Sequence, residues 1–149
     1  MRDGGYDISA YTDVNPAFGS MEDFTALVEA AHERGIRVLV DIVVNHTSDQ
    51  HPWFEASRKN PEGEYGDFYV WRDSDTDYQD ARIIFIDTET SNWTYDEVRG
   101  QYYWHRFFSH QPDLNFENPA VQAAVMNVVR YWCRTGVDGF RLDAIPLPI

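Results

Sequence analysis

An arginine and an aspartate near the end of the sequence have types and a spacing that could do chemistry. Arg141 and Asp143 fall within residues 137–144, a mixed apolar stretch that is typical of a strand. Side chains two positions apart on a strand leave the same face, so the guanidinium and the carboxylate should lie together. A nearby guanidinium favours the ionised carboxylate. Such an aspartate could act as a nucleophile on a glycosidic carbon, or the two residues could form a buried ion pair that only stabilises the fold.

Two more polar clusters lie at the start of the chain and at the end of a valine-rich stretch. Residues 3–7 read Asp-Gly-Gly-Tyr-Asp, and the two glycines let the chain turn tightly and bring the Tyr6 ring near a ligand. Tyr6 could equally be an ordinary aromatic that fills the mouth of the fold. His46 could be a structural histidine or part of a site. Its neighbour Asn45 could cap the next loop or offer its carbonyl oxygen to a hard cation such as calcium.

A first helix is expected after Ser20. Ser20 is a good N-cap, and Asp23 three residues later can complete a capping box. The expected apolar stripe of this helix consists of Phe24, Leu27, Val28 and Ala31. Gly35 follows as the residue that ends the helix.

A second helix is expected from Asn118 to Gly136. Asn118 is the N-cap and Pro119 occupies the first helical position. The expected buried face consists of Val121, Val125, Val128, Val129 and Trp132. Cys133 lies in the same amphipathic stretch, and we expect it to be an ordinary packing residue.

Each expected helix is followed at once by an apolar stretch. Residues 36–44 form a long β-branched run, and residues 137–144 form a shorter one. A strand of this kind directly after a helix indicates a parallel sheet covered on its outer face, and therefore an α/β fold. Residues 1–8 should hold the tail of one further strand, which gives roughly three strands in all.

A long segment, residues 47–117, separates the first apolar run from the second helix. A structureless loop of that length is improbable in a compact domain. We interpret it as a small irregular insert subdomain between two parts of the main fold, residues 1–46 and 118–149. Its strand-like pieces are residues 68–71, 82–86 and 101–104.

Composition excludes several kinds of partner. With 12 basic against 25 acidic residues, the net charge of −13 would repel phosphate backbones, so no nucleic acid is expected. No stretch approaches the roughly 18 apolar residues of a membrane helix, and the first residues lack a secretory pattern. Aromatic residues make up 15% of the chain and suit either a pyranose face or a Tyr/Trp-rich core. The single cysteine favours a reducing compartment, which we take to be the cytoplasm. Nothing in the sequence indicates an oligomeric state.

Together, these motifs resemble the α-amylase superfamily, glycoside hydrolase family 13. Residues 41–46 (Asp-Ile-Val-Val-Asn-His) resemble its first signature region, and residues 139–144 (Gly-Phe-Arg-Leu-Asp-Ala) resemble its second. Residues 111–115 (Gln-Pro-Asp-Leu-Asn) resemble the insert motif of the α-glucosidase and oligo-1,6-glucosidase branch. Residues 81–89 and 102–116 look like the insert of the trehalose synthase branch. The resemblance implies a fragment of a (β/α)₈ TIM barrel with a long irregular insert after one strand.

The resemblance also implies a role for each matching residue. Asp143 corresponds to the nucleophile, and Arg141 corresponds to the arginine that orients it. The residues implied in substrate binding are Asp3, Tyr6, His46 and Gln111. Asn45 and Asp113 correspond to ligands of a structural calcium that joins the insert to the barrel. No organic cofactor is implied.

The activity that the resemblance implies is interconversion of the disaccharides maltose and trehalose, by a maltose α-D-glucosyltransferase. A plain α-glucosidase or oligo-1,6-glucosidase would share every catalytic residue present. A barrel that has lost its chemistry would instead be a binding or scaffold module. The family's general acid/base glutamate and third carboxylate follow later strands, so we expect an incomplete active site in this chain. Residues 144–149 also differ from the family's tyrosine-containing stretch, whose acid completes the calcium site.

Overall fold

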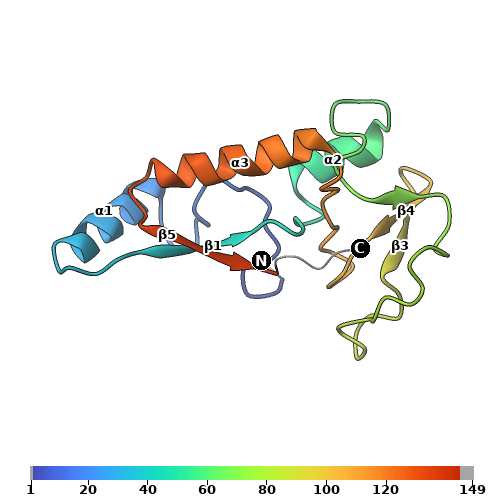
Figure 1. Ribbon diagram of the computed structural model, residues 1–149, viewed down its shortest axis with the longest axis horizontal. Coiled ribbons are helices and arrows are strands. Elements are labelled where there is room, and N and C mark those ends of the chain that lie inside the picture. The colour runs from blue at the N-terminus through green and yellow to red at the C-terminus, as the bar shows by residue number, and fades with distance from the viewer. Residues whose placement is uncertain (1, 145–149) are drawn as a thin grey trace.

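The computed structural model describes residues 2–144, in which three helices and two small sheets are found (Figure 1). The elements are α1 (Met21–His32), β1 (Leu39–Val43), α2 (Pro52–Lys59), β2 (Trp71–Arg72), β3 (Trp93–Asp96), β4 (Gln101–Trp104), α3 (Pro119–Cys133) and β5 (Gly139–Asp143). The long helix α3 runs along the pair β1–β5, with α1 near one end and α2 and the second sheet near the other (Figure 1). Within residues 2–144, no helix combines the length and apolar character needed to cross a membrane.

The strands β1 and β5 pair in parallel, as the sequence predicted. Their register places Asp41 opposite Arg141 and Val43 opposite Asp143. The described residues contain two parallel strands and not three, because residues 2–8 form bends. Gly4 and Gly5 have φ angles of 80° and 113°, which are incompatible with an extended strand. The expectation of a strand tail before the first helix was therefore wrong.

The helix α1 begins as the sequence predicted. The Ser20 side chain accepts a hydrogen bond from the Asp23 backbone, and the Asp23 side chain accepts one from the Ser20 backbone, which completes the capping box. The chain leaves the helix through Gly35, whose φ of 70° suits a glycine. One prediction failed here, because Leu27 is 60% exposed while its neighbour Val28 is buried. The helix touches its neighbours through a narrower stripe than its apolar pattern indicated.

The helix α3 has Asn118 as its N-cap and Pro119 in its first turn, as predicted. Its buried residues are Val121, Val125, Val128 and Trp132, and Val129 is partly buried. Cys133 is exposed, so the expectation that it packs in the core was wrong. The next residue on a helix is turned by about a quarter of a circle, which rotates Cys133 off the face that Trp132 buries.

The segment between β1 and α3 contains one helix and a three-stranded antiparallel sheet in the order β2-β4-β3. The expected strand at 101–104 is confirmed as β4. The expected strand at 68–71 is only partly correct, because β2 begins at Trp71 and Tyr69 makes an isolated bridge to Leu114. The expected strand at 82–86 is wrong, because the Glu89 backbone donates to the Phe85 carbonyl at 2.8 Å and closes a turn.

Two elements of the insert, α2 and β3, were not predicted. The α2 helix has an unusual N-cap, since the His51 ring accepts a hydrogen bond from the Trp53 backbone. Pro52 then starts the helix. Histidine is not among the residues that normally signal an N-cap, which is why this helix was not predicted.

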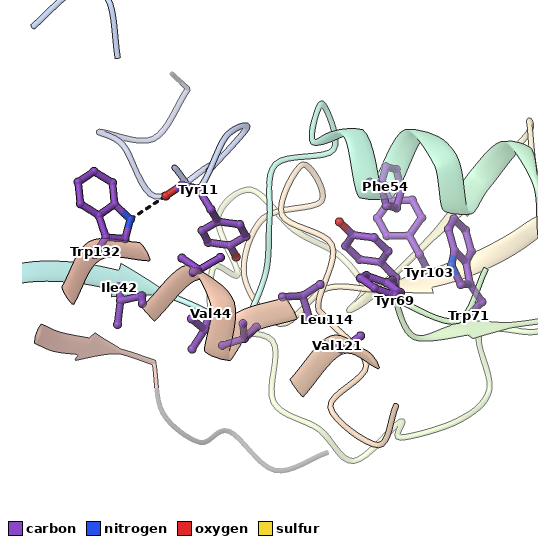
Figure 2. Close-up of a cluster of buried hydrophobic side chains, with 13 residues drawn as sticks. Tyr11, Ile42, Val44, Phe54, Tyr69, Trp71, Tyr103, Leu114, Val121 and Trp132 are labelled. Atoms are coloured by element: carbon purple, nitrogen blue, oxygen red, sulfur yellow. Dashed lines mark hydrogen bonds between the residues drawn. The ribbon is translucent and has the colours of Figure 1, made fainter. Parts of the chain in front are cut away.

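One continuous hydrophobic core joins the insert to the rest of the fold (Figure 2). On one side, Trp132 of α3 donates its indole N–H to the Tyr11 carbonyl at 2.7 Å, close to Ile42 and Val44 (Figure 2). On the insert side, the ring of Phe54 lies 1% exposed among other rings. The aromatic residues that contact it are Tyr69, Trp71 and Tyr103. This shared core fixes the insert against the carboxyl end of β1.

Candidate active site

The parallel register of β1 and β5 brings three charged side chains together at one face. The Nη1 atom of Arg141 lies 2.8 and 2.7 Å from the two carboxylate oxygens of Asp41. The Nη2 atom of the same guanidinium lies 3.2 Å from Oδ1 of Asp143. The predicted Arg141–Asp143 pair is therefore present, and Asp41 is a third member that the sequence reasoning did not assign to the site. Its signal was available, because Asp41 and Arg141 occupy matching positions in the two apolar runs.

This cluster faces solvent in the described part of the chain. The Arg141 side chain is 58% exposed and that of Asp143 is 21% exposed. The hydrogen bonds and charge of Asp41, with a smaller contribution from Asp143, raise the pKa of Arg141 further above its usual value. A fixed positive charge thus lies beside the Asp143 carboxylate.

The Tyr6 segment and His46 border the same cluster. The Tyr6 hydroxyl donates to Oδ2 of Asp41 at 3.3 Å, and Nε2 of His46 lies 3.2 Å from the Tyr6 carbonyl oxygen. His46 is 2% exposed. Burial lowers the pKa of His46 to about 4, against the opposing effects of the Tyr6 carbonyl, Asp3 and Asp143. The imidazole is therefore neutral near pH 7 and donates from Nε2.

Asp3 connects the chain's first residues to the insert. Its Oδ1 atom accepts hydrogen bonds from the backbone N–H groups of Tyr6 at 2.8 Å and Asp7 at 2.9 Å. Its Oδ2 atom accepts from the Gln111 amide and lies 3.4 Å from Nε2 of His110. The carboxylate is 6% exposed. Burial opposes its ionisation, but hydrogen bonds from Asp7, Tyr6 and His110 outweigh that effect and lower the pKa of Asp3.

The two predicted calcium ligands are neighbours, since His46 and Asp113 form a β-bridge and the Leu114 backbone donates to the Asn45 carbonyl at 2.9 Å. Burial raises the pKa of Asp113 to about 7, against opposing contributions from the Arg106 backbone N–H and the Asn45 side chain.

The Arg106 backbone and the Asn45 side chain offer N–H donors to the Asp113 carboxylate, whereas Ca²⁺ binds six to eight oxygen ligands. Residues 2–144 contain no group of three or more His, Cys, Asp or Glu side chains able to hold a metal. The described residues alone do not fit a calcium site, so calcium stays a prediction and enters no step below.

Aromatic rings of the insert lie in a row beside the charged cluster, starting next to His46. Phe85 and Phe108 stack with ring centroids 4.2 Å apart, and Phe108 stacks on His110 at 5.2 Å. Phe107 lies 5.3 Å from the His46 ring. The sequence predicted an aromatic stretch that includes Phe107 and Phe108, but it indicated no role for Phe85 or His110, because only the fold brings these separate loop residues into one row.

All eight predicted site residues thus gather in two connected groups at the carboxyl ends of β1 and β5. Arg141, Asp143, Tyr6 and His46 form the first group with Asp41. Asp3 and Gln111 join that group to the insert, and Asn45 and Asp113 lie directly behind His46. The roles implied for these residues stay predictions.

Comparison with known proteins gives one consistent family. A family model described as "Alpha amylase, catalytic domain" matches residues 1–148. The chain is 64% identical over 146 residues to the trehalose synthase of a Pimelobacter species, covering 98% of this chain and 26% of that protein. It is also 64% identical over 146 residues to the trehalose synthase/amylase TreS of Mycolicibacterium smegmatis, covering 98% and 25%.

Among solved structures, the trehalulose synthase MutB from Pseudomonas mesoacidophila superposes with a TM-score of 0.87 at 42% identity. The match covers 96% of this chain and 26% of MutB. A MutB variant has been crystallised in complex with its substrate sucrose. The chain therefore spans about a quarter of the length of these relatives, and the expected fold class, part of a (β/α)₈ barrel with an insert, is confirmed.

Proposed function

Because the chain belongs to the alpha-amylase catalytic-domain family, we propose that the protein containing it transfers glucosyl groups with retention of configuration, using Asp143 as the nucleophile. The observation that carries the proposal is the 3.2 Å contact between Nη2 of Arg141 and Oδ1 of Asp143. A guanidinium at that distance orients the carboxylate and places a positive charge beside it, and a carboxylate in that role is what must attack the anomeric carbon in a retaining enzyme.

The other residues of the cluster bind and orient the sugar in this proposal. The Tyr6 ring packs against one face of the reacting glucose, where an aromatic face suits the apolar C–H surface. The neutral His46 imidazole and the Asp3 carboxylate bind its hydroxyl groups, and Gln111 supports Asp3 from the insert. Asp143 forms a bond to the anomeric carbon as the bond from that carbon to the leaving glucose oxygen breaks. The leaving oxygen needs a proton from a second carboxyl group, which we assign to no residue of this chain.

The substrate we propose is maltose, converted to trehalose by a maltose α-D-glucosyltransferase. The freed glucose stays in the site, turns, and attacks the glucosyl-enzyme through its own anomeric hydroxyl. The aromatic row of Phe85, Phe108 and His110 supports this, since an apolar insert beside the site excludes water that would otherwise take the glucosyl group. The relatives at 64% identity carry trehalose synthase names, which also supports it.

The test is incubation of the full-length protein with maltose, followed by separate measurement of trehalose and glucose. We expect trehalose as the main product and glucose as a minor one. If glucose were the sole product, the isomerase would be replaced by the α-glucosidase or oligo-1,6-glucosidase alternative. If maltose remained unchanged, the scaffold alternative would take its place.

Two smaller expectations belong to the same proposal. We propose a cytoplasmic location, which fits one exposed cysteine and is tested by cell fractionation. We keep calcium as a prediction about the full-length protein, to be checked by metal analysis after dialysis against a chelator. Asn45 and Asp113 would be two of its ligands.

A further inference from the structure

Four N–H groups of the protein surround the carboxylate of Asp3. An ionised carboxylate has about four acceptor positions, two on each oxygen. The backbone N–H groups of Tyr6 and Asp7 donate to Oδ1 at 2.8 and 2.9 Å. The Gln111 amide donates to Oδ2, and Nε2 of His110 lies 3.4 Å from the same oxygen. A glucose hydroxyl can therefore donate to this carboxylate only where one of these donors moves away.

His110 is the donor whose position is least fixed. The two donors to Oδ1 are backbone groups of a tight turn, and they cannot move without a change in the path of the chain. Gln111 is 3% exposed and is held at both ends of its amide, because its Oε1 atom accepts from the Phe108 backbone at 3.2 Å. The His110 side chain is 20% exposed, and its 3.4 Å contact is longer than an ordinary N–H···O hydrogen bond. A glucose hydroxyl would thus displace His110 first.

We propose that His110 is a specificity-determining residue, which binds the same glucose hydroxyl as Asp3. The hydroxyl inserts between the two side chains, donates a hydrogen bond to Oδ2 of Asp3 and accepts one from Nε2 of His110. An ionised carboxylate only accepts and an imidazole N–H only donates, whereas a hydroxyl does both. The pair therefore binds a hydroxyl and rejects a sugar that has a hydrogen atom in its place. The inference rests on the proposed function, in which Asp3 binds the reacting glucose.

The packing of the His110 ring permits this small movement. The ring stacks on Phe108 with centroids 5.2 Å apart and planes 8° from parallel, and Phe108 stacks in turn on Phe85. A stacked ring slides in its own plane with less loss of contact than it tilts. The backbone at His110 stays in place, because its carbonyl accepts from the Asp49 N–H at 3.0 Å. The insert thus keeps Nε2 beside Asp3 while the ring shifts to admit a hydroxyl.

The competing explanation is that His110 only packs between Phe108 and Asp3. Two substitutions separate the explanations. His110→Phe keeps a ring for the stack and removes the N–H. His110→Gln removes the ring and keeps an amide N–H near the position of Nε2. A packing role is lost in the Gln variant, and a hydrogen-bonding role is lost in the Phe variant.

The experiment measures kcat/KM for consumption of maltose and of four maltose analogues by the full-length protein. Each analogue lacks one hydroxyl of the transferred glucose, at C2, C3, C4 or C6. We expect His110→Phe to lower kcat/KM for maltose about 10-fold, mainly through KM, because a hydrogen bond to the bound sugar is lost. For the one analogue that lacks the hydroxyl bound by Asp3 and His110, the same substitution should change kcat/KM by less than about 2-fold. His110→Gln should stay within about 3-fold of the unchanged protein on maltose, because it keeps the donor.

Two further variants make the result specific. Asp3→Asn identifies the hydroxyl independently, because the analogue least affected by it should be the same one that is insensitive to His110→Phe. Should Asp3→Asn or His110→Phe not fold, Asp3→Ser or His110→Leu is measured in its place with the same expectation. The matched control is His32→Phe. Nε2 of His32 lies 2.8 Å from Asp138 in a histidine–carboxylate pair outside the site, and its replacement should leave every kcat/KM unchanged.

The outcomes separate this inference from the proposed function. If the unchanged protein consumes no maltose, the proposed function fails and the inference fails with it. If maltose is consumed and His110→Phe lowers kcat/KM by the same factor for all four analogues, or leaves it unchanged, His110 binds no glucose hydroxyl. A greater loss in His110→Gln than in His110→Phe would also overturn the inference, because it would assign His110 to packing. Formation of glucose in place of trehalose affects the proposed activity alone, since the comparison uses maltose consumption.

Discussion

The β1–β5 pair and the insert contribute to the site in different ways. The pair supplies charged side chains directly from adjacent strands, and Arg141 and Asp143 remain partly exposed there. The insert supplies a tightly packed aromatic core, with Phe54 1% and Trp104 2% exposed, and borders the site with the rings of Phe85, Phe107 and Phe108. The difference shows that backbone register places the charged side chains, while side-chain packing in the insert holds the loops that border them.

The strongest test of the difference between the two regions is at Asp143, the nucleophile that we propose on the β1–β5 pair. Replacing Asp143 with Asn in the full-length protein should lower kcat/KM on the order of 10⁴-fold, because the carboxylate that forms the covalent bond is lost. Thermal unfolding of the variant is measured beside turnover, so that a loss of chemistry is distinguished from a loss of folding. Turnover equal to that of the unchanged protein would remove the nucleophile assignment and favour the scaffold alternative.

The insert should respond in the opposite way, through stability and not through chemistry. Phe54→Ala removes a ring that contacts Tyr69, Trp71 and Tyr103, and it should lower the free energy of unfolding by about 3–5 kcal/mol. Denaturant unfolding of the full-length protein measures this. The matched control is Phe18→Ala, whose ring is 72% exposed, and its effect should be close to zero. Equal effects of the two variants would contradict the packing described for the insert.

Gln111 tests the junction between the two regions. Gln111→Leu removes the amide that donates to Oδ2 of Asp3 and leaves part of a carboxylate that is 6% exposed without this donor. An unsatisfied buried acceptor costs about 1–3 kcal/mol, so we expect KM to rise about 10-fold with a smaller change in kcat. Gln122→Leu is the control, because the Gln122 amide likewise donates one hydrogen bond, to the Phe116 carbonyl, but lies on the exposed surface of α3. An unchanged KM in the Gln111 variant would show that the insert does not support substrate binding.

The smallest expected effect is a pH dependence of stability. Burial lowers the pKa of His51 to about 4 from an ordinary value of 6.5. The unfolded chain takes up a proton between these values and the folded chain does not, so stability falls as the pH drops from 6.5 to about 4. His51→Asn keeps an N-cap acceptor for α2 but does not titrate. The slope of unfolding free energy against pH should become shallower by at most ~1.4 kcal/mol per pH unit in that window.

His46 titrates in the same range, with its pKa also lowered to about 4 by burial. The His51 variant should therefore retain part of the slope. A slope identical to that of the unchanged protein would show that His51 is not held neutral in the fold.

The sequence predicted the parts of the structure that obey local rules. The capping residues Ser20 and Asn118 and the glycines that follow each helix located α1 and α3. The alternation of Arg141 and Asp143 placed both side chains on one face of β5. These features depend only on residues close in the chain, so a pattern can reveal them.

The parts that the sequence did not predict depend on distant contacts. The histidine cap of α2 at His51 is stabilised by ring contacts with Tyr11 and Trp53. Residues 82–86 are apolar enough for a strand, yet Phe85 is held by stacking on Phe108, which competes with strand pairing. The place of Asp41 in the charged cluster becomes visible only once the register of β1 against β5 is known.

The pairing of β1 with β5 also has a consequence for how the chain folds. The Asp41–Arg141 contact joins residues 100 positions apart, so this sheet has a high contact order. The entropy of closing so long a loop opposes the pairing, and folding of the intervening segment shortens the effective loop. We therefore expect the insert to fold before the charged cluster assembles. Variants that slow insert folding, such as Phe54→Ala, should delay the appearance of activity during refolding more than they change the final activity.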